Sequence, residues 1–372
     1  MNRRTHPGLY IHVPFCRSKC VYCDFYSETH LSMVSAWLKA LGQEMLLYRG
    51  LFPAFDTLYI GGGTPTILDA EQLGRLFEMI YHSVQFTDDA EITVEANPND
   101  VTAGKLARLR ECGVNRISLG VQSFDDQDLS FLKRRHTARE AEQALERIGH
   151  SGIANLSLDL IYGIPGRTAA GWGRNLEQAV SFSPAHISCY QLTVAGGTPL
   201  HEMQRRGVAR MPGDSEGESL FLATARCLER AGYLHYEISN YARGEENISR
   251  HNSKYWRHVP YLGLGPSAHS FRKDRRWWNC RSVADYCRVL GEGRMPVSGE
   301  EVLTPGQLEL ESLCLGLRTC GGVDEALLFS SGRRRALLTE LLRAGYVRHE
   351  CRRVMPTTRG FLVADRLAAA LG

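Results

Sequence analysis

The chain has 372 residues, a length that predicts two or three domains at roughly 150 residues each. Hydrophobic residues make up 43% of it, enough for a sizeable core, and the 44 basic and 41 acidic side chains leave a formal charge of +3. That near balance argues against a general polyanion binder. The amino terminus shows no apolar segment of the signal-peptide kind, and no apolar run approaches a membrane span, so we expect a cytoplasmic protein.

Six strand-like segments alternate with helix-like segments between residue 9 and about residue 200. This alternation predicts βαβ units and a parallel sheet, with two units fewer than the eight of a closed barrel. The predicted strands are 9–15, 57–60, 91–95, 116–120, 156–161 and 186–192. The predicted helices lie near 32–48, 69–82, 102–112, 137–150 and 170–181. Thr102 is a candidate N-cap, and Thr137 with Glu140 has the spacing of a capping box.

Polar or glycine-rich residues follow each of these strands, as in Gly61-Gly62-Gly63-Thr64-Pro65. Sites in such folds lie at the carboxyl ends of the strands. We therefore expect a functional site at this edge of the sheet.

The second half of the chain is less regular. Residues 200–290 are rich in aromatic side chains, and the glycine- and proline-containing segment 291–299 is typical of a linker. From Pro305 the pattern predicts three helices, a basic strand-like stretch over 346–355 and a last helix from Thr358, together a small winged-helix-like domain. The expected domains are 1–200, 201–298 and 299–372.

Three of the eleven cysteines are clustered: Cys16, Cys20 and Cys23. The odd total and the scattered positions of the others are unlike a secreted disulfide framework. Three thiolates on one short loop are typical of an iron–sulfur cluster with one iron left for an exchangeable ligand. A zinc site remains the alternative, with Asp24 or His12 as its fourth ligand.

The C-x3-C-x2-C triad after the first strand and the glycine loop after the second resemble the radical S-adenosylmethionine superfamily. The resemblance implies a partial (β/α)6 TIM-like barrel and a 4Fe-4S cluster on the three cysteines. It also implies S-adenosylmethionine on the fourth iron, held through glycines that let the backbone approach closely and through side chains that pair with its polar groups. The cofactor-binding residues that the resemblance implies are Tyr10, Tyr22, Gly62, Gly63, Thr64, Glu95, Gln122, Arg134 and Asp159.

Motifs spread over residues 9–271 are similar to the oxygen-independent coproporphyrinogen III oxidase group. The oxidase proper carries a fourth cysteine where this chain has Phe25, and a long amino-terminal extension where this chain has its first predicted strand from residue 9. Both departures favour the sister family of HemW-type haem chaperones. The segment His251-Asn-Ser-Lys-Tyr-Trp256 resembles that family's H-N-x-x-Y-W motif, which implies that His251 ligates haem.

The resemblance thus implies a chaperone that passes haem to apo-haemoproteins, with an electron donor for the cluster as a further partner. One alternative is a coproporphyrinogen III dehydrogenase, in which reductive cleavage of the cofactor makes a 5′-deoxyadenosyl radical. Another is a nucleic-acid binder acting through the basic carboxyl-terminal segment around Arg343, Arg348 and Arg352. No convincing set of base-contacting side chains accompanies it, so we expect no nucleic-acid partner.

Overall fold

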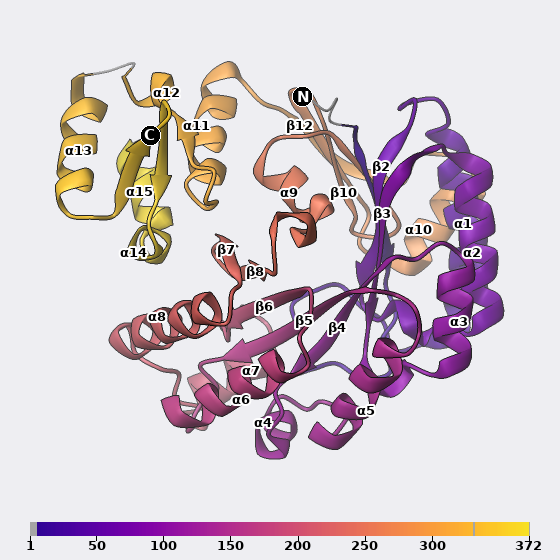
Figure 1. The fold of residues 1–372 in the computed structure, drawn as a ribbon. Helices are drawn as coiled ribbons and strands as arrows, with labels where there is room; N and C mark the ends of the chain where they lie inside the picture. Colours follow the sequence, from indigo (N-terminus) through magenta and orange to yellow (C-terminus); the bar gives the residue numbers. More distant parts are fainter. Residues whose placement is uncertain (1–5, 330–331, 372) are drawn as a thin grey trace.

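The structure is a computed structural model that describes residues 6–329 and 332–371. In these residues a curved sheet of 12 strands has the order β12-β11-β10-β9-β1-β2-β3-β4-β5-β6-β8-β7 (Figure 1). The central strands, from β9 through β1 to β6, run parallel to one another. They are β1 (Gly8–Val13), β2 (Phe55–Gly62), β3 (Phe86–Ala96), β4 (Arg116–Gln122), β5 (Asn155–Tyr162), β6 (His186–Gln191) and β9 (Tyr261–Leu264).

The strands and helices predicted before residue 200 are confirmed, with ends shifted by a few residues. The helices are α1 (Val34–Leu47), α2 (Ala70–Ser83), α3 (Ala103–Glu111), α5 (Ala138–Gly149) and α6 (Ala169–Ser181), and a short α4 (Asp126–Phe131) was not predicted. Both predicted starts are present. Thr102 accepts a hydrogen bond from the Lys105 N–H, and Thr137 and Glu140 form a capping box. These caps satisfy N–H groups that have no partner within the helix.

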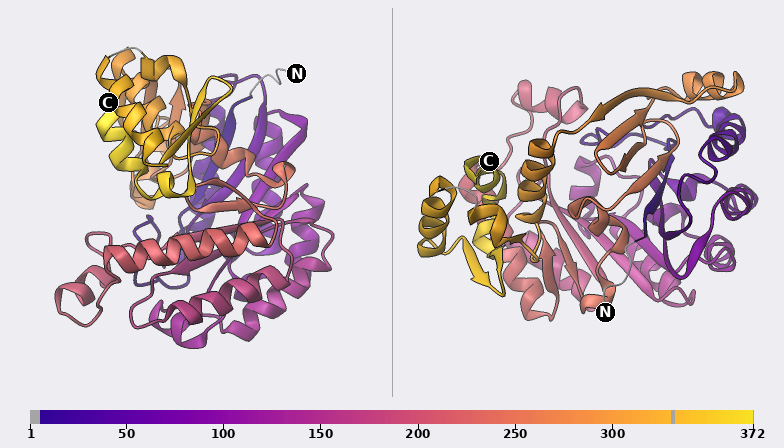
Figure 2. Two further views of the ribbon diagram at one scale, coloured as in Figure 1. Left: turned by 60° about the vertical axis from the view of Figure 1, so that its left-hand side comes forward. Right: turned by 90° about the horizontal axis from the view of Figure 1, so that it is seen from above.

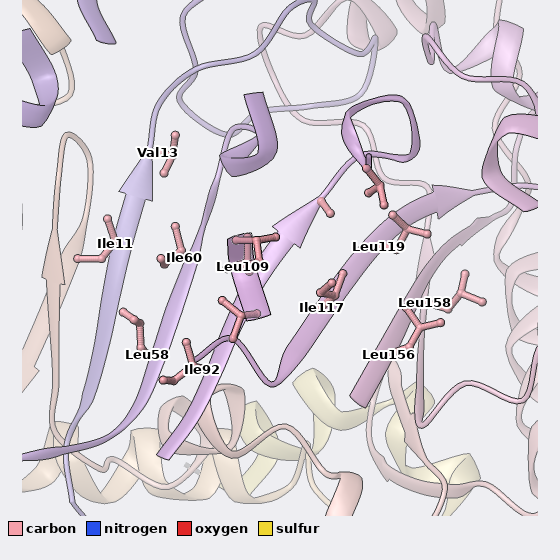
Figure 3. Packing of buried hydrophobic residues seen from close by; sticks show 14 of the residues in the cluster. Ile11, Val13, Leu58, Ile60, Ile92, Leu109, Ile117, Leu119, Leu156 and Leu158 are labelled. Atoms are coloured by element: carbon pink, nitrogen blue, oxygen red, sulfur yellow. The ribbon is translucent and has the colours of Figure 1, made fainter. Parts of the chain in front are cut away.

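The parallel strands present an aliphatic face to the helices and a polar face to the inside of the curve. Ile117, Leu119 and Leu158 are fully buried in the main hydrophobic cluster, where Figure 3 shows them with Leu109 of α3. Because side chains alternate along a strand, Ser118 and Asp159 between them lie on the other face. Burial of each aliphatic side chain contributes about 2 kcal/mol, and it leaves the polar face free for a site.

Residues 200–290, expected to be less regular, are built from short strands and helices. They hold α7 (Pro199–Arg205), α8 (Asp214–Arg230), β7 (Leu234–Glu237), β8 (Asn240–Ala242), α9 (Arg250–Trp256), β10 (His269–Arg272), β11 (Arg275–Asn279) and α10 (Val283–Gly291). The strands are only three to five residues long and pair antiparallel at the two edges of the sheet. Segments so short carry little periodicity, and distant partners stabilise them.

The expected linker is partly a strand. β12 (Val297–Val302) pairs antiparallel with β11, so the sheet continues past residue 299 to Val302. Gly299 looked like a turn residue, but it lies against the indole of Trp278, which takes the space of a side chain there. The glycine marks a close contact rather than a turn.

A second unit follows the sheet. It contains α11 (Pro305–Gly316), β13 (Val323–Asp324), α12 (Glu325–Phe329), α13 (Gly332–Arg343), β14 (Val347–Glu350), β15 (Arg353–Pro356), α14 (Thr358–Leu362) and α15 (Ala364–Leu371). The strands form a small antiparallel sheet in the order β13-β15-β14, around a hydrophobic cluster of its own. The three predicted helices are present, whereas the basic stretch 346–355 holds two strands and two helices follow from Thr358 in place of the one predicted. This unit contacts the main body through α11 on α9 and α14 on α8, and Figure 2 shows it beside the large sheet.

Among the described residues, no helix combines the length and the apolar character needed to span a bilayer.

Candidate cofactor site

A cavity of about 470 Å³ lies at the carboxyl ends of β1 to β6 and extends along their polar face to α9. It brings together every site residue predicted from the sequence except Tyr10 and His251. The predicted residues that line it are Cys16, Cys20, Tyr22, Cys23, Gly62, Gly63, Thr64, Glu95, Gln122, Arg134 and Asp159. Residues far apart in the sequence meet there because the parallel strands end at one edge of the sheet.

The three cysteines lie on the loop that follows β1. The Cys16 N–H donates to the Glu28 carbonyl at 2.9 Å, which closes the loop, and Sγ of Cys16 lies 3.4 Å from Oγ1 of Thr64. Burial raises the pKa of the Cys23 thiol to about 11. Basic side chains surround the loop and favour bound anions such as thiolates. Those that line the cavity beside it are Arg17, Lys19, Lys133, Arg134 and Arg135.

The glycine loop packs directly on the cysteine loop. The Gly63 and Thr64 N–H groups donate to the carbonyls of Val13 and Phe15, both at 2.8 Å. Gly62 has a φ of 105°, and a Cβ at Gly63 would lie 2.5 Å from the Phe15 carbonyl oxygen. Only glycine allows this approach, so the loop presents bare backbone to the cavity.

Arg134 lies between α4 and α5, and its side chain bridges β4 and the cysteine loop. Its guanidinium donates to Asn97 Oδ1 at 2.6 Å and to the Gly120 carbonyl at 2.9 Å, and it lies 3.4 Å from Sγ of Cys20. Its buried Nε has no hydrogen-bond partner among the described residues. An unpartnered buried donor is rare and points to an anionic ligand.

Two partly buried carboxyl groups face the same cavity. Glu95 accepts from the Tyr59 hydroxyl at 2.8 Å and from the Gly62 N–H at 3.0 Å, and burial raises its pKa to about 7. Asp159 accepts from Ser118 at 3.0 Å, and burial raises its pKa as well. The two side chains offer acceptors for the hydroxyl or amino groups of a ligand.

Tyr22 and Gln122 complete this wall. Burial raises the pKa of the Tyr22 phenol above its ordinary value. Gln122 has a φ of 68° at an irregularity in the pairing of β4 with β5. A non-glycine residue in the left-handed region is strained, and such strain is typical of functional sites.

Tyr10 and His251 lie outside this cavity. The Tyr10 hydroxyl is 3.0 Å from Nδ1 of His12. His251 is fully buried, with Nδ1 2.8 Å from the Thr57 hydroxyl and Nε2 2.8 Å from the Tyr255 hydroxyl. Burial lowers its pKa to about 3, so it is neutral. Both ring nitrogens of His251 are therefore engaged, and a role as iron ligand requires one of these hydrogen bonds to break.

The donor set suits an iron–sulfur cluster better than zinc. His12 uses both ring nitrogens, for Tyr10 and for the Tyr26 carbonyl, and so offers no fourth ligand. Asp24 lines the same cavity and remains the alternative fourth ligand of a zinc site. A polynuclear cluster takes one thiolate per iron, so three thiolates suffice when an exchangeable ligand completes the fourth iron. Three thiols on one cavity, beside a glycine cradle and an unpartnered guanidinium nitrogen, fit the cluster with its exchangeable ligand.

The sequence reasoning missed Tyr59, Asn97 and Ser118, which hold Glu95, Arg134 and Asp159 in place. A signal for Tyr59 and Ser118 was present, because both alternate with buried aliphatic residues on predicted strands.

Comparisons with known proteins agree with this geometry. Residues 10–179 match the radical SAM superfamily. The chain is 36% identical over 371 residues to the haem chaperone HemW of Mycobacterium tuberculosis, covering 98% of this chain and 94% of the relative. It is 37% identical over 321 residues to HemW of Bacillus subtilis, covering 85% and 84%. Its fold is similar to that of the coproporphyrinogen III oxidase HemN from Escherichia coli, a radical SAM enzyme, with a TM-score of 0.85 at 24% identity over 99% of this chain and 90% of the other. The chain belongs to the HemW haem chaperone family of the radical SAM superfamily.

Proposed function

We propose that this chain is a cytoplasmic haem chaperone that binds haem and passes it to apo-haemoproteins. The observation that carries the proposal is the similarity to a named haem chaperone over 98% of the chain, at 36% identity. The aligned region includes the cofactor cavity, α9 and the carboxyl-terminal unit. The similarity therefore extends beyond residues 10–179, which match the superfamily.

In this proposal Cys16, Cys20 and Cys23 hold a 4Fe-4S cluster, and S-adenosylmethionine is its exchangeable ligand. When bound, the cluster would supply a redox-active iron with one open position, for which an electron donor is a further partner. The backbone of Gly62, Gly63 and Thr64 binds the methionine end. The support is the superfamily match together with the shared cavity and the bare backbone of the glycine loop.

The remaining polar residues of the cavity orient the cofactor. Arg134 pairs with its carboxylate through the unpartnered Nε, and Glu95, Gln122 and Asp159 accept or donate hydrogen bonds at its amino group and ribose. Tyr22 covers it from the cysteine loop, since it lines the same cavity. Tyr10 supports the cofactor indirectly. Its hydroxyl bonds the ring of His12, which lies against Gly62 of the glycine loop.

The finer architecture belongs to the same proposal. The sequential parallel order β1 to β6 supports a partial (β/α)6 barrel. The order helix, strand, two helices and two strands from α11 to β15 supports a winged-helix-like domain. The core, the aromatic-rich region and this domain correspond to the ranges 1–200, 201–298 and 299–372, with the last boundary moved past Val302 because β12 ends there.

A coproporphyrinogen III dehydrogenase is the second candidate, favoured by the TM-score of 0.85 to the oxidase. Phe25 weighs against it. This residue stands two positions after Cys23, lines the cavity and is 66% exposed, and its hydrocarbon ring offers no ligand atom to a metal.

Nucleic-acid binding is disfavoured because arginines of the carboxyl-terminal unit form hydrogen bonds within that unit. Arg352 donates to Glu325 at 3.1 Å, and Arg353 donates to the carbonyl of Gly322 at 2.6 Å. Guanidinium groups held by their own domain are less available to phosphates.

The test uses the full chain, purified without oxygen and reconstituted with iron and sulfide. Haem is titrated in and followed by its Soret absorption, and the loaded protein is then mixed with an apo-haemoprotein of distinct spectrum. We expect one haem per chain and transfer to the acceptor. Absence of stoichiometric haem binding, or conversion of coproporphyrinogen with release of 5′-deoxyadenosine, would overturn the proposal.

A further inference from the structure

A second cavity, of about 560 Å³, lies between α9 and the carboxyl-terminal unit. Its size is in the range of pockets that enclose drug-sized organic ligands, roughly 300–1,000 Å³. α9 is the wall between the two cavities. Ser249 and Asn252 line the cofactor cavity, whereas Ser253 and Trp256 line the second one.

His258, just after α9, presents a ring nitrogen to the second cavity. Its Nε2 lies 3.1 Å from Oε2 of Glu311, which is outside the cavity lining. Its Nδ1 lies 3.4 Å from Oγ of Ser312, which is part of that lining. The contact to Ser312 is long and weak, so Nδ1 is the available nitrogen. A histidine that ligates a metal through one nitrogen commonly donates its other N–H to a carboxylate, as His258 is placed to do to Glu311.

His258 follows Arg257, the C-cap of α9, and its φ of 51° is the left-handed conformation in which helices commonly end. The Val259 N–H donates to the Lys254 carbonyl at 3.1 Å and closes this helix end around His258. The backbone turn therefore fixes the position of His258 between α9 and the second cavity.

The rest of the lining suits a flat aromatic dianion. Trp256 is half-buried at the cavity and offers an apolar ring face. Arg257 lines the cavity and is exposed, and its guanidinium makes no hydrogen bond or ion pair with any residue that the structure describes. A free guanidinium pairs well with a carboxylate.

We propose that the second cavity binds haem, with Nδ1 of His258 as an axial ligand of the iron and Arg257 paired with a propionate. The inference rests on the proposed function and gives it a site. On binding, the lone pair of the neutral imidazole forms the bond to iron, the proton stays on Nε2 toward Glu311, and the weak contact to Ser312 is lost. His251 then anchors α9 rather than ligating iron.

The experiment compares the reconstituted full-length wild type with His258→Gly. Glycine adopts the left-handed backbone freely and leaves a space that imidazole can fill. We expect the variant to lose the Soret spectrum of histidine-ligated haem and to bind haem at least tenfold more weakly. Added imidazole should restore the spectrum, which a purely structural defect would not allow. Cluster content and S-adenosylmethionine binding should be unchanged.

Matched controls separate the outcomes. His150→Gly, at an exposed position on another helix, should leave the haem spectrum unchanged, and Arg257→Gln should weaken haem binding while Arg226→Gln on α8 should not. If wild type binds haem and His258→Gly has the same spectrum and affinity, the inference is wrong although the proposed function stands. The same holds if only His251→Ala loses the spectrum and imidazole restores it. If wild type binds no haem, the proposed function itself fails.

Discussion

Nδ1 of His251 on α9 lies 2.8 Å from Oγ1 of Thr57 on β2, and both side chains are fully buried. A residue of the central sheet thereby holds the helix that separates the two cavities. The Tyr255 hydroxyl, 2.8 Å from Nε2, engages the other side of the ring. This imidazole thus joins α9 to the central sheet.

Replacement of His251 by Gln should change the pH dependence of stability. Burial lowers the pKa of His251 to about 3 from 6.5, so below pH 6.5 the unfolded state binds the proton and the folded state does not. Wild type should therefore lose about 3 kcal/mol relative to the variant as the pH falls from 6.5 to 4. Urea unfolding at several pH values measures the difference.

A control in the same helix distinguishes this effect from general acid sensitivity. Ser253→Ala changes no titratable group, so its difference in unfolding free energy from wild type should not vary with pH. A constant difference for His251→Gln as well would show that the imidazole is not neutral in the folded protein.

The cluster should depend on three of the eleven cysteines. Cys16→Ser, Cys20→Ser and Cys23→Ser should each lose most of the iron and sulfide after reconstitution, because a serine hydroxyl does not replace a thiolate. Cys314→Ser, in the separate carboxyl-terminal unit, should keep the wild-type content. The measurement is the iron and sulfide content per chain. Wild-type content in Cys16→Ser, Cys20→Ser or Cys23→Ser would contradict the assignment of that cysteine as a cluster ligand.

The close contact between the glycine loop and the cysteine loop should be intolerant of a methyl group. Gly63→Ala would place Cβ 2.5 Å from the Phe15 carbonyl oxygen, and we expect a loss of about 2 kcal/mol in unfolding free energy. S-adenosylmethionine binding should weaken as well. Gly104→Ala in α3 meets nothing within 4 Å and should be neutral or stabilising by about 0.5 kcal/mol. Equal stabilities of the two variants in urea would refute the packing argument.

Arg134→Lys should impair cofactor binding more than folding. A lysine keeps the charge but cannot bond Asn97, Gly120 and a ligand carboxylate at once. We expect the dissociation constant of S-adenosylmethionine to rise at least about tenfold, the equivalent of about 1.4 kcal/mol, in calorimetry on the reconstituted protein. The matched change Arg108→Lys, in a surface pair with Glu111, should leave it unchanged. An unaltered affinity in Arg134→Lys would remove this residue from the site.

Local patterns predicted the regular half of the fold. The six parallel strands and the caps at Thr102 and Thr137 depend on residues within a few positions of one another, so the sequence displays them. The edge strands β10 and β11 were missed because they are short, and β12 was missed because it contains Gly299, whose side-chain space is filled by Trp278.

The sequence by itself determined the order of strand–helix units, the cysteine triad and the glycine loop, because each is written in contiguous residues. Only the tertiary structure decided which side chains face a cavity. His251 and His258 are seven positions apart, yet the first is enclosed between β2 and α9 and the second borders a cavity beside the carboxyl-terminal unit. The physical reason is that exposure depends on what packs against a helix from distant parts of the chain, and a local motif does not record its neighbours.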